Sequence, residues 1–267
     1  MDKIKQKGTV QEFGDQFKQH SKIDDHWGSI EMLRDIVRPF NLDQNTLENK
    51  TICEIGSGSG RILKNLSTFS PKKIFSIEPS DAIEVAKENN KDSKTEIIFK
   101  KITAQEMQFN NEMDYVFSLG VIHHIPDDLI VCKKIYNSLK PNGKFIIWLY
   151  GKEGNELYLF IFNNLRKVTK LLPDKLLNLI SIFLNFFLSF YIYLCKFFNL
   201  PLKKYIENVI GKCSFEKRKY IIFDQLNPSY SKYYTKDEVN NLLDKAGFKK
   251  IQILHRHGYS WTAVAEK

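Results

Sequence analysis

Residues 51–61 read TICEIGSGSGR, and they indicate both a fold and a kind of ligand. The first five are mostly apolar and include β-branched side chains, which is typical of a buried parallel strand. Three glycines follow at alternating positions, where the backbone can take a positive φ and a ligand can approach bare main chain. Residues 62–66 continue with helical spacing. A strand, a tight turn and a helix N-terminus hold nucleotide-like ligands at the edge of parallel sheets.

The glycine spacing argues against a dinucleotide ligand. In the G-x-G-x-x-G fingerprint the third glycine would fall on Arg61 or Leu63. This chain instead has E-x-G-x-G-x-G, with Glu54 inside the first strand and Glu78 at the end of the next predicted strand. A carboxylate at Glu78 can accept both hydroxyls of a ribose, and Glu54 suits an ammonium group. These residues favour a ligand with a ribose, an amino-acid tail and no pyrophosphate.

Five motifs in order make the chain resemble the class I S-adenosylmethionine-dependent methyltransferases. They are EIGSGSG at 54–60, IEPS at 77–80, TAQE at 103–106, DYVFSLGVIHHI at 114–125 and LKPNGKF at 139–145. The resemblance implies an α/β fold: a Rossmann-like seven-stranded sheet, mostly parallel, closed by a C-terminal antiparallel hairpin. It also implies an enzyme that uses S-adenosyl-L-methionine. The FGDQ opening at 13–16 and a long aromatic insertion add a diffuse similarity to methyltransferases of bacterial surface glycans and other small molecules.

The resemblance also assigns the cofactor contacts. A residue after the third strand faces the adenine ring in this family, and the usual aspartate is Thr103 here. A hydroxyl can still hydrogen-bond the exocyclic amine of adenine. The implied cofactor-binding residues are Glu54, Gly56, Ser57, Gly58, Gly60, Glu78, Pro79, Thr103, Ala104, Gln105 and Leu119.

The periodicity of the rest of the chain divides it into three parts. Strands are expected at 50–55, 73–78, 95–100, 113–119 and 143–150, and they alternate with helices at about 60–69, 80–90 and 127–140. A Thr235 N-cap and a Gly247 C-cap bound a helix, before strands at 248–254 and 260–265. We therefore expect an N-terminal helical lid at 1–49, a methyltransferase core at 50–150 and 235–267, and an inserted helical cap at 151–234.

The cap contains twenty residues, 176–195, without a charge. Their length alone makes them a transmembrane candidate, and lysines flank both ends. Asn178, Ser181, Asn185 and Ser189 fall on one stripe of a helix, however, and a span would put the two halves of the core in different compartments. We expect a buried cap helix or one that forms a homodimer. An interfacial membrane helix and a membrane span are less favoured interpretations of the same segment.

Candidate catalytic and acceptor-binding residues surround the predicted carboxyl end of the sheet. His123 and His124 follow the fourth strand, where a general base would lie beside the sulfonium, although a histidine pair can also simply hold the loop. Tyr150 ends the fifth strand. The expected acceptor-binding residues are Trp27, Arg218, Tyr230, Tyr233 and Tyr234, because tyrosine faces suit sugar rings and arginine suits phosphate. His255-Arg256-His257 either points to solvent or also binds the acceptor.

The charge and the cysteine content limit which binding partners and which compartment we expect. The net charge is +9, from 34 Lys and 6 Arg against 31 Asp and Glu. This is either a solvated lysine surface or an attraction to a phosphorylated substrate or an anionic membrane surface. No nucleic-acid partner is expected, because arginine is scarce and no helix-turn-helix, zinc or RNP motif occurs. Four cysteines without a C-x-x-C pair indicate no metal and a reducing cytoplasm, and residues 1–7 lack the apolar core of a signal peptide.

Three functions remain open from the sequence. The first is O-methylation of a small molecule, such as a sugar, a sugar phosphate or another precursor in surface polysaccharide biosynthesis. The second is methylation of a lipid or quinone at the membrane surface, which the apolar cap and its lysines favour. The third is a non-catalytic binding protein with a methyltransferase-like fold, against which the intact glycine turn and Glu78 argue.

Overall fold

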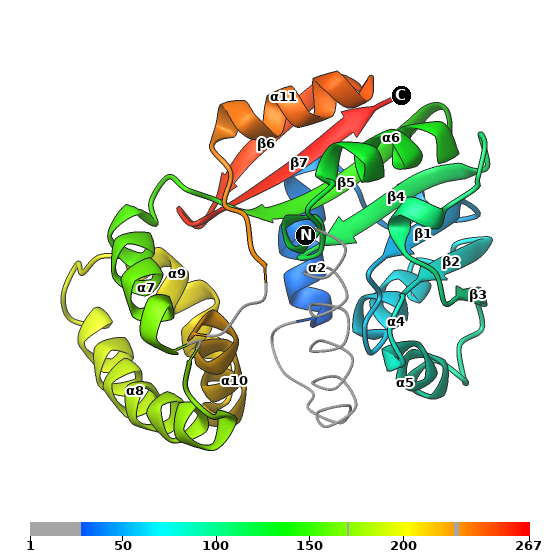
Figure 1. The fold of residues 1–267 in the computed structure, drawn as a ribbon. Coiled ribbons are helices and arrows are strands. Elements are labelled where there is room, and N and C mark those ends of the chain that lie inside the picture. Colours follow the sequence, from blue (N-terminus) through cyan, green and yellow to red (C-terminus); the bar gives the residue numbers. More distant parts are fainter. Residues whose placement is uncertain (1–27, 170, 227–229) are drawn as a thin grey trace.

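The computed structural model describes residues 28–169, 171–226 and 230–267. One seven-stranded sheet organises them, in the order β3-β2-β1-β4-β5-β7-β6 (Figure 1). Only β7 runs antiparallel to its neighbours, which confirms the predicted fold class. The strands are β1 (Thr51–Ile55), β2 (Lys73–Ile77), β3 (Glu96–Lys100), β4 (Met113–Leu119), β5 (Leu139–Tyr150), β6 (Lys249–Arg256) and β7 (Ser260–Glu266).

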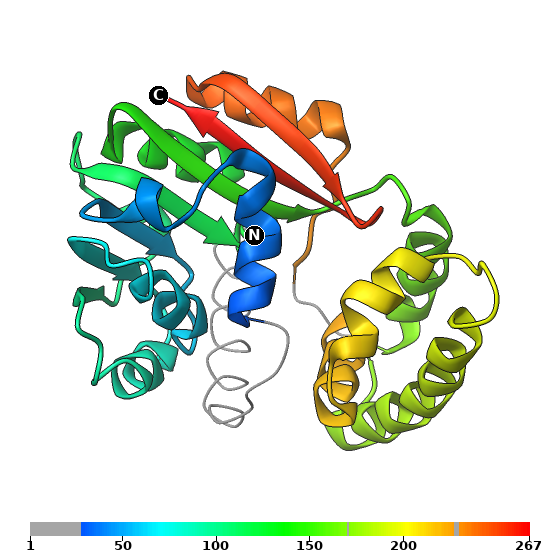
Figure 2. The same cartoon turned by 180° about the vertical axis from the view of Figure 1, so that it is seen from behind.

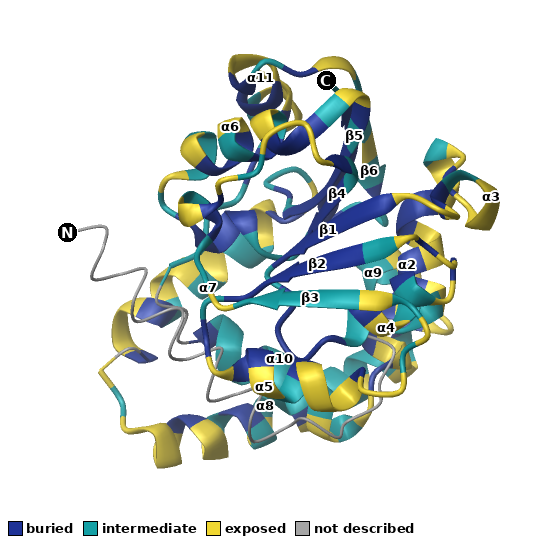
Figure 3. Ribbon diagram, turned by 90° about the vertical axis from the view of Figure 1, so that its right-hand side faces the viewer, coloured by how far each residue is buried: buried dark blue, intermediate teal, exposed yellow. Residues whose placement is uncertain are grey.

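Helices cover both faces of this sheet because alternate strand residues point to opposite sides. Ile52 packs with the helices of one face and Cys53 with those of the other. β1 is buried along its whole length, as Figure 3 shows, which is why its sequence is mostly apolar. On one face lie α2 (Ile30–Val37), α3 (Gln44–Leu47), α4 (Arg61–Ser67) and α5 (Ala82–Asn89), and on the other lie α6 (Asp128–Ser138) and α11 (Lys236–Ala246).

The predicted signals at the ends of α11 are confirmed. Thr235 and Glu238 form a capping box, and Gly247 ends the helix with φ of 107°. Other boundaries differ from the prediction. β5 begins at Leu139 instead of 143, because Leu139 pairs with Met113 ahead of a register shift. Residues 224–226 are the last turn of a helix within the insertion.

Four helices between β5 and α11 form a cap beside the carboxyl ends of the parallel strands (Figures 1 and 2). The two ends of this insertion meet: Lys152 N–H donates to the Tyr234 carbonyl at 2.8 Å, and Tyr234 N–H donates to the Tyr150 carbonyl at 2.9 Å. The cap therefore leaves and rejoins the core at one place, and Tyr205 and Val209 of the cap also pack against Trp148 and Tyr259 of the core. Its helices are α7 (Glu156–Thr169), α8 (Asp174–Cys195), α9 (Lys203–Asn208) and α10 (Phe215–Leu226).

The apolar segment of the cap is a helix, α8, but it is not a buried one. Of its 22 residues only Leu177, Ser181, Asn185 and Cys195 are buried. Three residues of the expected polar stripe, Ser181, Asn185 and Ser189, lie on the inner side of α8, while Asn178 is exposed. Some apolar side chains, such as Leu177 and Leu184, share this inner side and pack toward α10, but the large aromatic ones face outward. By length and hydropathy α8 is the one helix among the described residues that meets the criteria for crossing a membrane. Of the two alternatives that we expected, a buried helix is therefore wrong, because the phenylalanines of α8 lie on its exposed side, and a homodimer contact stays a prediction.

The N-terminal helix α2 is tied to the end of β6. Arg256 is buried and donates from Nε to Asp35 Oδ2 at 2.6 Å, and the His257 ring contacts the same oxygen at 2.8 Å. Burial alone would raise the pKa of Asp35, but the Arg256 guanidinium and the His257 ring together outweigh burial and lower that pKa. The expected lid residues Phe13 and Trp27 lie outside the described part of the chain.

Candidate active site

The turn after β1 has a shape that only glycine allows at two positions. Gly56 has φ of 72°, and a Cβ there would lie 2.4 Å from a methyl carbon of Val121. Gly60 has φ of 78° and begins α4, and a Cβ there would lie 2.5 Å from the Asn90 side chain. The glycines therefore let the turn fit closely against the loop after β4 and against α5.

Glu78 fastens this turn from the end of β2. Its Oε2 accepts from the Gly58 N–H at 2.9 Å, and its Oε1 accepts from the Ser80 N–H at 3.0 Å and the Ser80 hydroxyl at 2.6 Å. The Ser57 and Ser76 hydroxyls are 2.7 Å apart. Since a carboxylate offers about four acceptor positions, Glu78 keeps capacity for a ribose hydroxyl while it holds the turn.

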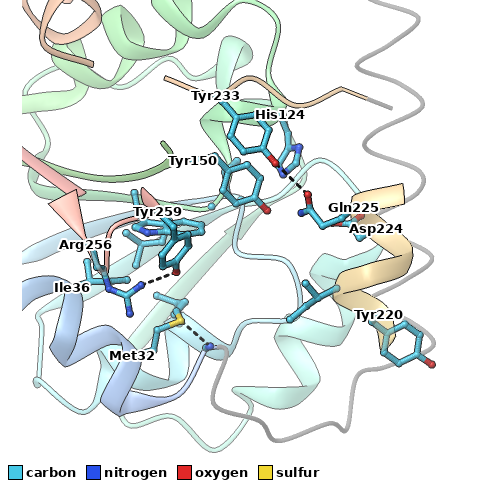
Figure 4. A pocket seen from close by; sticks show the side chains of 18 of the residues that line it. Met32, Ile36, His124, Tyr150, Tyr220, Asp224, Gln225, Tyr233, Arg256 and Tyr259 are labelled. Carbon is cyan, nitrogen blue, oxygen red and sulfur yellow. Dashed lines mark hydrogen bonds between the residues drawn. The ribbon is translucent and has the colours of Figure 1, made fainter. Parts of the chain in front are cut away.

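A cavity of about 780 Å³ lies between this turn and the cap (Figure 4). Nine of the eleven predicted cofactor-binding residues line it. The other two, Gly58 and Gly60, shape the turn without facing the cavity. The nine are Glu54, Gly56, Ser57, Glu78, Pro79, Thr103, Ala104, Gln105 and Leu119.

Several polar atoms in this half of the cavity have no hydrogen-bond partner among the described residues. Both side-chain amide atoms of Gln105 and the Oε2 of Glu54 are buried without a hydrogen bond. Burial, and then the nearby Glu78, raise the pKa of Glu54 well above its usual value. Because orphaned buried polar groups are costly, these atoms fit a ligand with a heterocyclic edge and a cationic tail. The residues present therefore fit S-adenosyl-L-methionine. The Thr103 hydroxyl donates to Glu106 at 2.8 Å, so it can only accept from such a ligand.

The two histidines of the 3-10 turn after β4 have different surroundings. His123 is fully buried, has neither ring nitrogen hydrogen-bonded, and does not line the cavity. Its ring stacks on Tyr150 with centroids 3.9 Å apart, and burial lowers its pKa well below the usual value. His123 therefore fits the structural alternative, in which the histidine holds the loop, and not the role of a general base.

His124 lines the cavity, and its orientation is fixed. Its Nδ1 lies 2.8 Å from the Tyr230 carbonyl oxygen, which can only accept, so Nδ1 carries the proton and Nε2 the lone pair. Burial lowers the pKa of His124, while Asp224 and the Tyr230 carbonyl oppose that shift. A neutral imidazole with a directed lone pair is suited to accept a proton.

Aromatic side chains form the middle of the cavity. Tyr150 stacks on Tyr233 at 5.2 Å between centroids, and both rings face α10, where Tyr233 donates from its hydroxyl to Gln225 at 3.2 Å (Figure 4). Burial raises the pKa of Tyr150 well above its usual value, as Asp224 does to a smaller extent. The Tyr150 hydroxyl therefore stays protonated and can act as a donor.

Three predicted acceptor-binding residues do not line the cavity. Arg218 uses its guanidinium within the cap, donating to Asn185 Oδ1, the Cys213 carbonyl and Ser189 Oγ. Tyr234 is fully buried, and its hydroxyl donates to Asp128 at 2.8 Å. Tyr230 contributes its main-chain carbonyl to His124. Of the five expected residues only Tyr233 lines the cavity, and Trp27 lies outside the described residues.

The structure also brings to the cavity residues that the sequence did not single out as binding residues. Lys217, Tyr220 and Asp224 come from one face of α10, and their spacing of three and four residues is the signal that could have found them. Arg256 and Tyr259 come from the turn between β6 and β7, and the Arg256 guanidinium donates to the Tyr259 hydroxyl at 3.0 Å. Of the two interpretations of 255–257, Arg256 thus follows the one that faces the cavity.

Comparisons with known proteins agree with this fold. Residues 53–147 match the family model described as a methyltransferase domain. The tRNA U34 carboxymethyltransferase of Nautilia profundicola is 29% identical over 136 residues, 50% of this chain and 44% of that one. Phosphoethanolamine N-methyltransferase 2 of Caenorhabditis elegans is 35% identical over 106 residues, 39% of this chain and 24% of that one. The chain spans less than half the length of these relatives.

Solved structures share the fold over most of the chain. An S-adenosylmethionine-dependent methyltransferase from Mesorhizobium loti has a TM-score of 0.54 at 11% identity, covering 90% of this chain and 99% of that one. Magnesium protoporphyrin IX methyltransferase from Synechocystis PCC 6803 has a TM-score of 0.54 at 13% identity, covering 91% and 85%. The solved structures show a Rossmann-like fold shared with class I methyltransferases. The family match identifies residues 53–147 as a methyltransferase domain, in agreement with the predicted enzyme class and cofactor.

Proposed function

We propose that this protein transfers the methyl group of S-adenosyl-L-methionine to a hydroxyl of a small-molecule acceptor. One observation carries the proposal: the same cavity extends from the turn held by Glu78 to a part lined by tyrosine rings, which we call the acceptor chamber. His124 and Tyr150 also line this cavity. When bound, the cofactor supplies an electrophilic methyl group on a sulfonium, which needs only an aligned nucleophile. Well-oriented reactants account for about 7–11 kcal/mol of such a barrier.

In this proposal each residue has a separate task. Glu78 and Gln105 orient the ribose and the heterocycle, and Glu54 faces the cationic tail. His124 accepts the acceptor's proton at Nε2, since Nδ1 is held by the Tyr230 carbonyl. Tyr150 donates a hydrogen bond to the acceptor, because its raised pKa keeps its hydroxyl protonated. The cap closes the chamber against water.

For the acceptor we retain a sugar, a sugar phosphate or another precursor of a bacterial surface glycan. The rings of Tyr158, Tyr205 and Tyr220 add to the chamber walls, and Lys217 is a cation for a phosphate group. Aromatic faces with hydroxyl tips suit an acceptor that has both apolar and polar faces. We place the reaction in the cytoplasm, consistent with four buried free cysteines.

Two further acceptor classes compete with this one. The expectation of no nucleic-acid partner is not supported, because several relatives are named as tRNA U34 carboxymethyltransferases. A lipid or quinone acceptor is favoured by the apolar outer side of α8. Either class keeps the cofactor half of the site unchanged.

The experiment is a survey of acceptors with methyl-labelled cofactor. The purified protein is incubated separately with nucleotide sugars, a lipid extract and bulk tRNA from one bacterium, and the labelled product is identified. We expect label in the sugar fraction, lost in His124→Ala and kept in the matched variant His255→Ala, whose ring stacks on Trp261 outside the cavity. Label only in tRNA or only in lipid would overturn the sugar assignment, and no label in any fraction would overturn the activity.

A further inference from the structure

The outer side of α8 is an apolar surface that nothing in the described chain covers. All but two of the exposed large hydrophobic side chains of the described residues lie between Leu157 and Phe198. Those on α8 recur every three or four residues and form one stripe; Phe183, Phe186, Phe187 and Phe190 are each about 60% exposed. We call this stripe the outer cap surface; it consists of Leu176, Leu179, Phe183, Phe186, Phe187, Phe190 and Tyr193.

The orientation of α8 is fixed by polar contacts on its inner side. Asn185 is fully buried; its Nδ2 donates to the Phe215 carbonyl at 2.8 Å, and its Oδ1 accepts from Arg218 Nε at 3.2 Å. Arg218 also donates to Ser189 Oγ at 3.2 Å. Rotating the helix to hide its phenylalanines would break these bonds and leave the Arg218 guanidinium without its two acceptors on α8. The apolar side therefore faces outward in the folded cap.

The charge around this surface identifies its partner. Residues 151–234 contain thirteen Lys and Arg against six Asp and Glu, most of the excess charge of the whole protein. Lys175 and Lys196 are exposed at the two ends of α8, where long side chains can reach a headgroup layer above an immersed helix. An apolar stripe with basic flanks is the pattern of a helix that lies in a membrane interface.

We propose that the outer cap surface binds the surface of an anionic lipid bilayer, with α8 lying in the plane of the interface. A second copy of the chain is a poorer occupant, because two such caps would bring like charges together. A membrane span is also a poorer fit, because α10 is bonded to α8 through Arg218 and would have to enter the bilayer with it.

Binding in this orientation has a geometric consequence for the cavity. Leu188 and Tyr191 of α8 line it from the inner side of the same helix. The chamber would then lie about one helix diameter, roughly 10 Å, from the lipid headgroups. Membrane binding itself does not depend on the identity of the acceptor or on methyl transfer, so either proposal can fail alone.

Vesicle flotation tests the apolar contribution. The whole protein is mixed with vesicles of phosphatidylcholine and phosphatidylglycerol, and partition is compared for wild type, Phe186→Asp/Phe190→Asp, and the control Ile130→Asp/Leu254→Asp. The control removes the two exposed hydrophobic side chains outside the cap. We expect wild type and control to float, and the cap variant to lose about tenfold for each phenylalanine, about a hundredfold together. Equal flotation of all three, or none of wild type, overturns the proposal.

A second arm tests the charges. We expect Lys175→Gln/Lys196→Gln to weaken binding about fivefold per lysine on anionic vesicles, and pure phosphatidylcholine to abolish the difference. The control is Lys249→Gln, a lysine exposed on the core. Binding that survives alkaline carbonate extraction would show a span instead. Concentration-dependent dimers that Phe186→Asp/Phe190→Asp dissociates, without vesicle binding by wild type, would show a second copy instead.

A dye attached to a single-cysteine substitution tests membrane binding without the multiple substitutions of the flotation experiment. Phe187→Cys places an exposed thiol on the outer cap surface, while the four native cysteines are buried. An environment-sensitive dye on this thiol should shift its emission to the blue with anionic vesicles and be quenched by brominated lipid. A dye at Ile130→Cys should do neither. An unchanged emission at position 187 overturns the proposal.

Discussion

Glu78 has two roles at the scale of a single residue: it holds the turn after β1, and it faces the cavity. We expect Glu78→Ala to weaken S-adenosyl-L-methionine binding by about 1.5–3 kcal/mol, the range for a hydrogen bond to a charged group. Calorimetric titration measures this. The control Glu84→Ala removes an exposed carboxylate that pairs with Lys87 on α5. Unchanged affinity in Glu78→Ala would disprove the assignment.

Asp224 faces His124 across the cavity and opposes the lowering of the pKa of that imidazole by burial. Asp224→Asn should therefore lower the pKa of His124 further, so that the ring stays neutral to a more acidic pH. An NMR titration of the His124 ring protons measures this without any acceptor. Asp237→Asn, exposed on α11, is the charge-matched control. A pKa that stays the same or rises in Asp224→Asn contradicts the prediction.

The two histidines also make stability depend on pH. In the folded protein, burial lowers the pKa of both His123 and His124 below the ordinary 6.5. Below that pH the unfolded chain therefore binds more protons than the folded chain. The free energy of unfolding is therefore highest above that pH. It decreases as the pH falls toward the lowered values, by up to about 1.4 kcal/mol per pH unit for each ring. Urea unfolding from pH 7 downward should show this slope, and His123→Phe should reduce it; an unchanged slope would rule out His123.

At the scale of the elements, α8 and α10 are joined by Arg218. Arg218→Ala leaves the buried Asn185 Oδ1 without this donor, so we expect the free energy of unfolding to fall by about 1–3 kcal/mol. Cofactor affinity should not change, because Arg218 does not line the cavity. Denaturant unfolding measures the loss, with Lys212→Ala, an exposed residue, as the control. If Arg218→Ala is as stable as wild type and has a raised KM for the acceptor, then Arg218 binds the acceptor, as the sequence had led us to expect.

Local sequence patterns predicted helices and strands well where the pattern depends on residues that are neighbours in the sequence. The glycine turn, the strands through residue 119 and the capping box at Thr235 depend on neighbours in sequence. Arg218 and Tyr234 were assigned to the acceptor because aromatic and basic residues cluster there. Their partners, Asn185 and Asp128, are 33 and 106 residues away, so only the packed cap reveals them.

At the scale of the whole molecule, the buried Arg256 connects α2, the β6–β7 turn and the cavity. Asp35→Ala leaves that guanidinium with the Tyr259 hydroxyl as its remaining side-chain hydrogen-bond partner among the described residues. We expect the free energy of unfolding to fall by about 1.5–3 kcal/mol. Thermal and denaturant unfolding measure the loss, with Asp43→Ala, which caps the short helix α3, as a comparison worth about 1 kcal/mol. A loss no larger than that of Asp43→Ala would show that the contact between Asp35 and Arg256 contributes little to stability.

The insertion leaves the sheet at Tyr150 and returns at Tyr234, whose backbones are hydrogen-bonded to each other. A segment whose two ends touch can be exchanged for another without moving the strands on either side. An exchange of this segment would keep the cofactor-binding residues, which lie outside it, and would replace the cap side of the cavity and the outer cap surface together. One such exchange would therefore alter both the acceptor and the lipid contact that we propose.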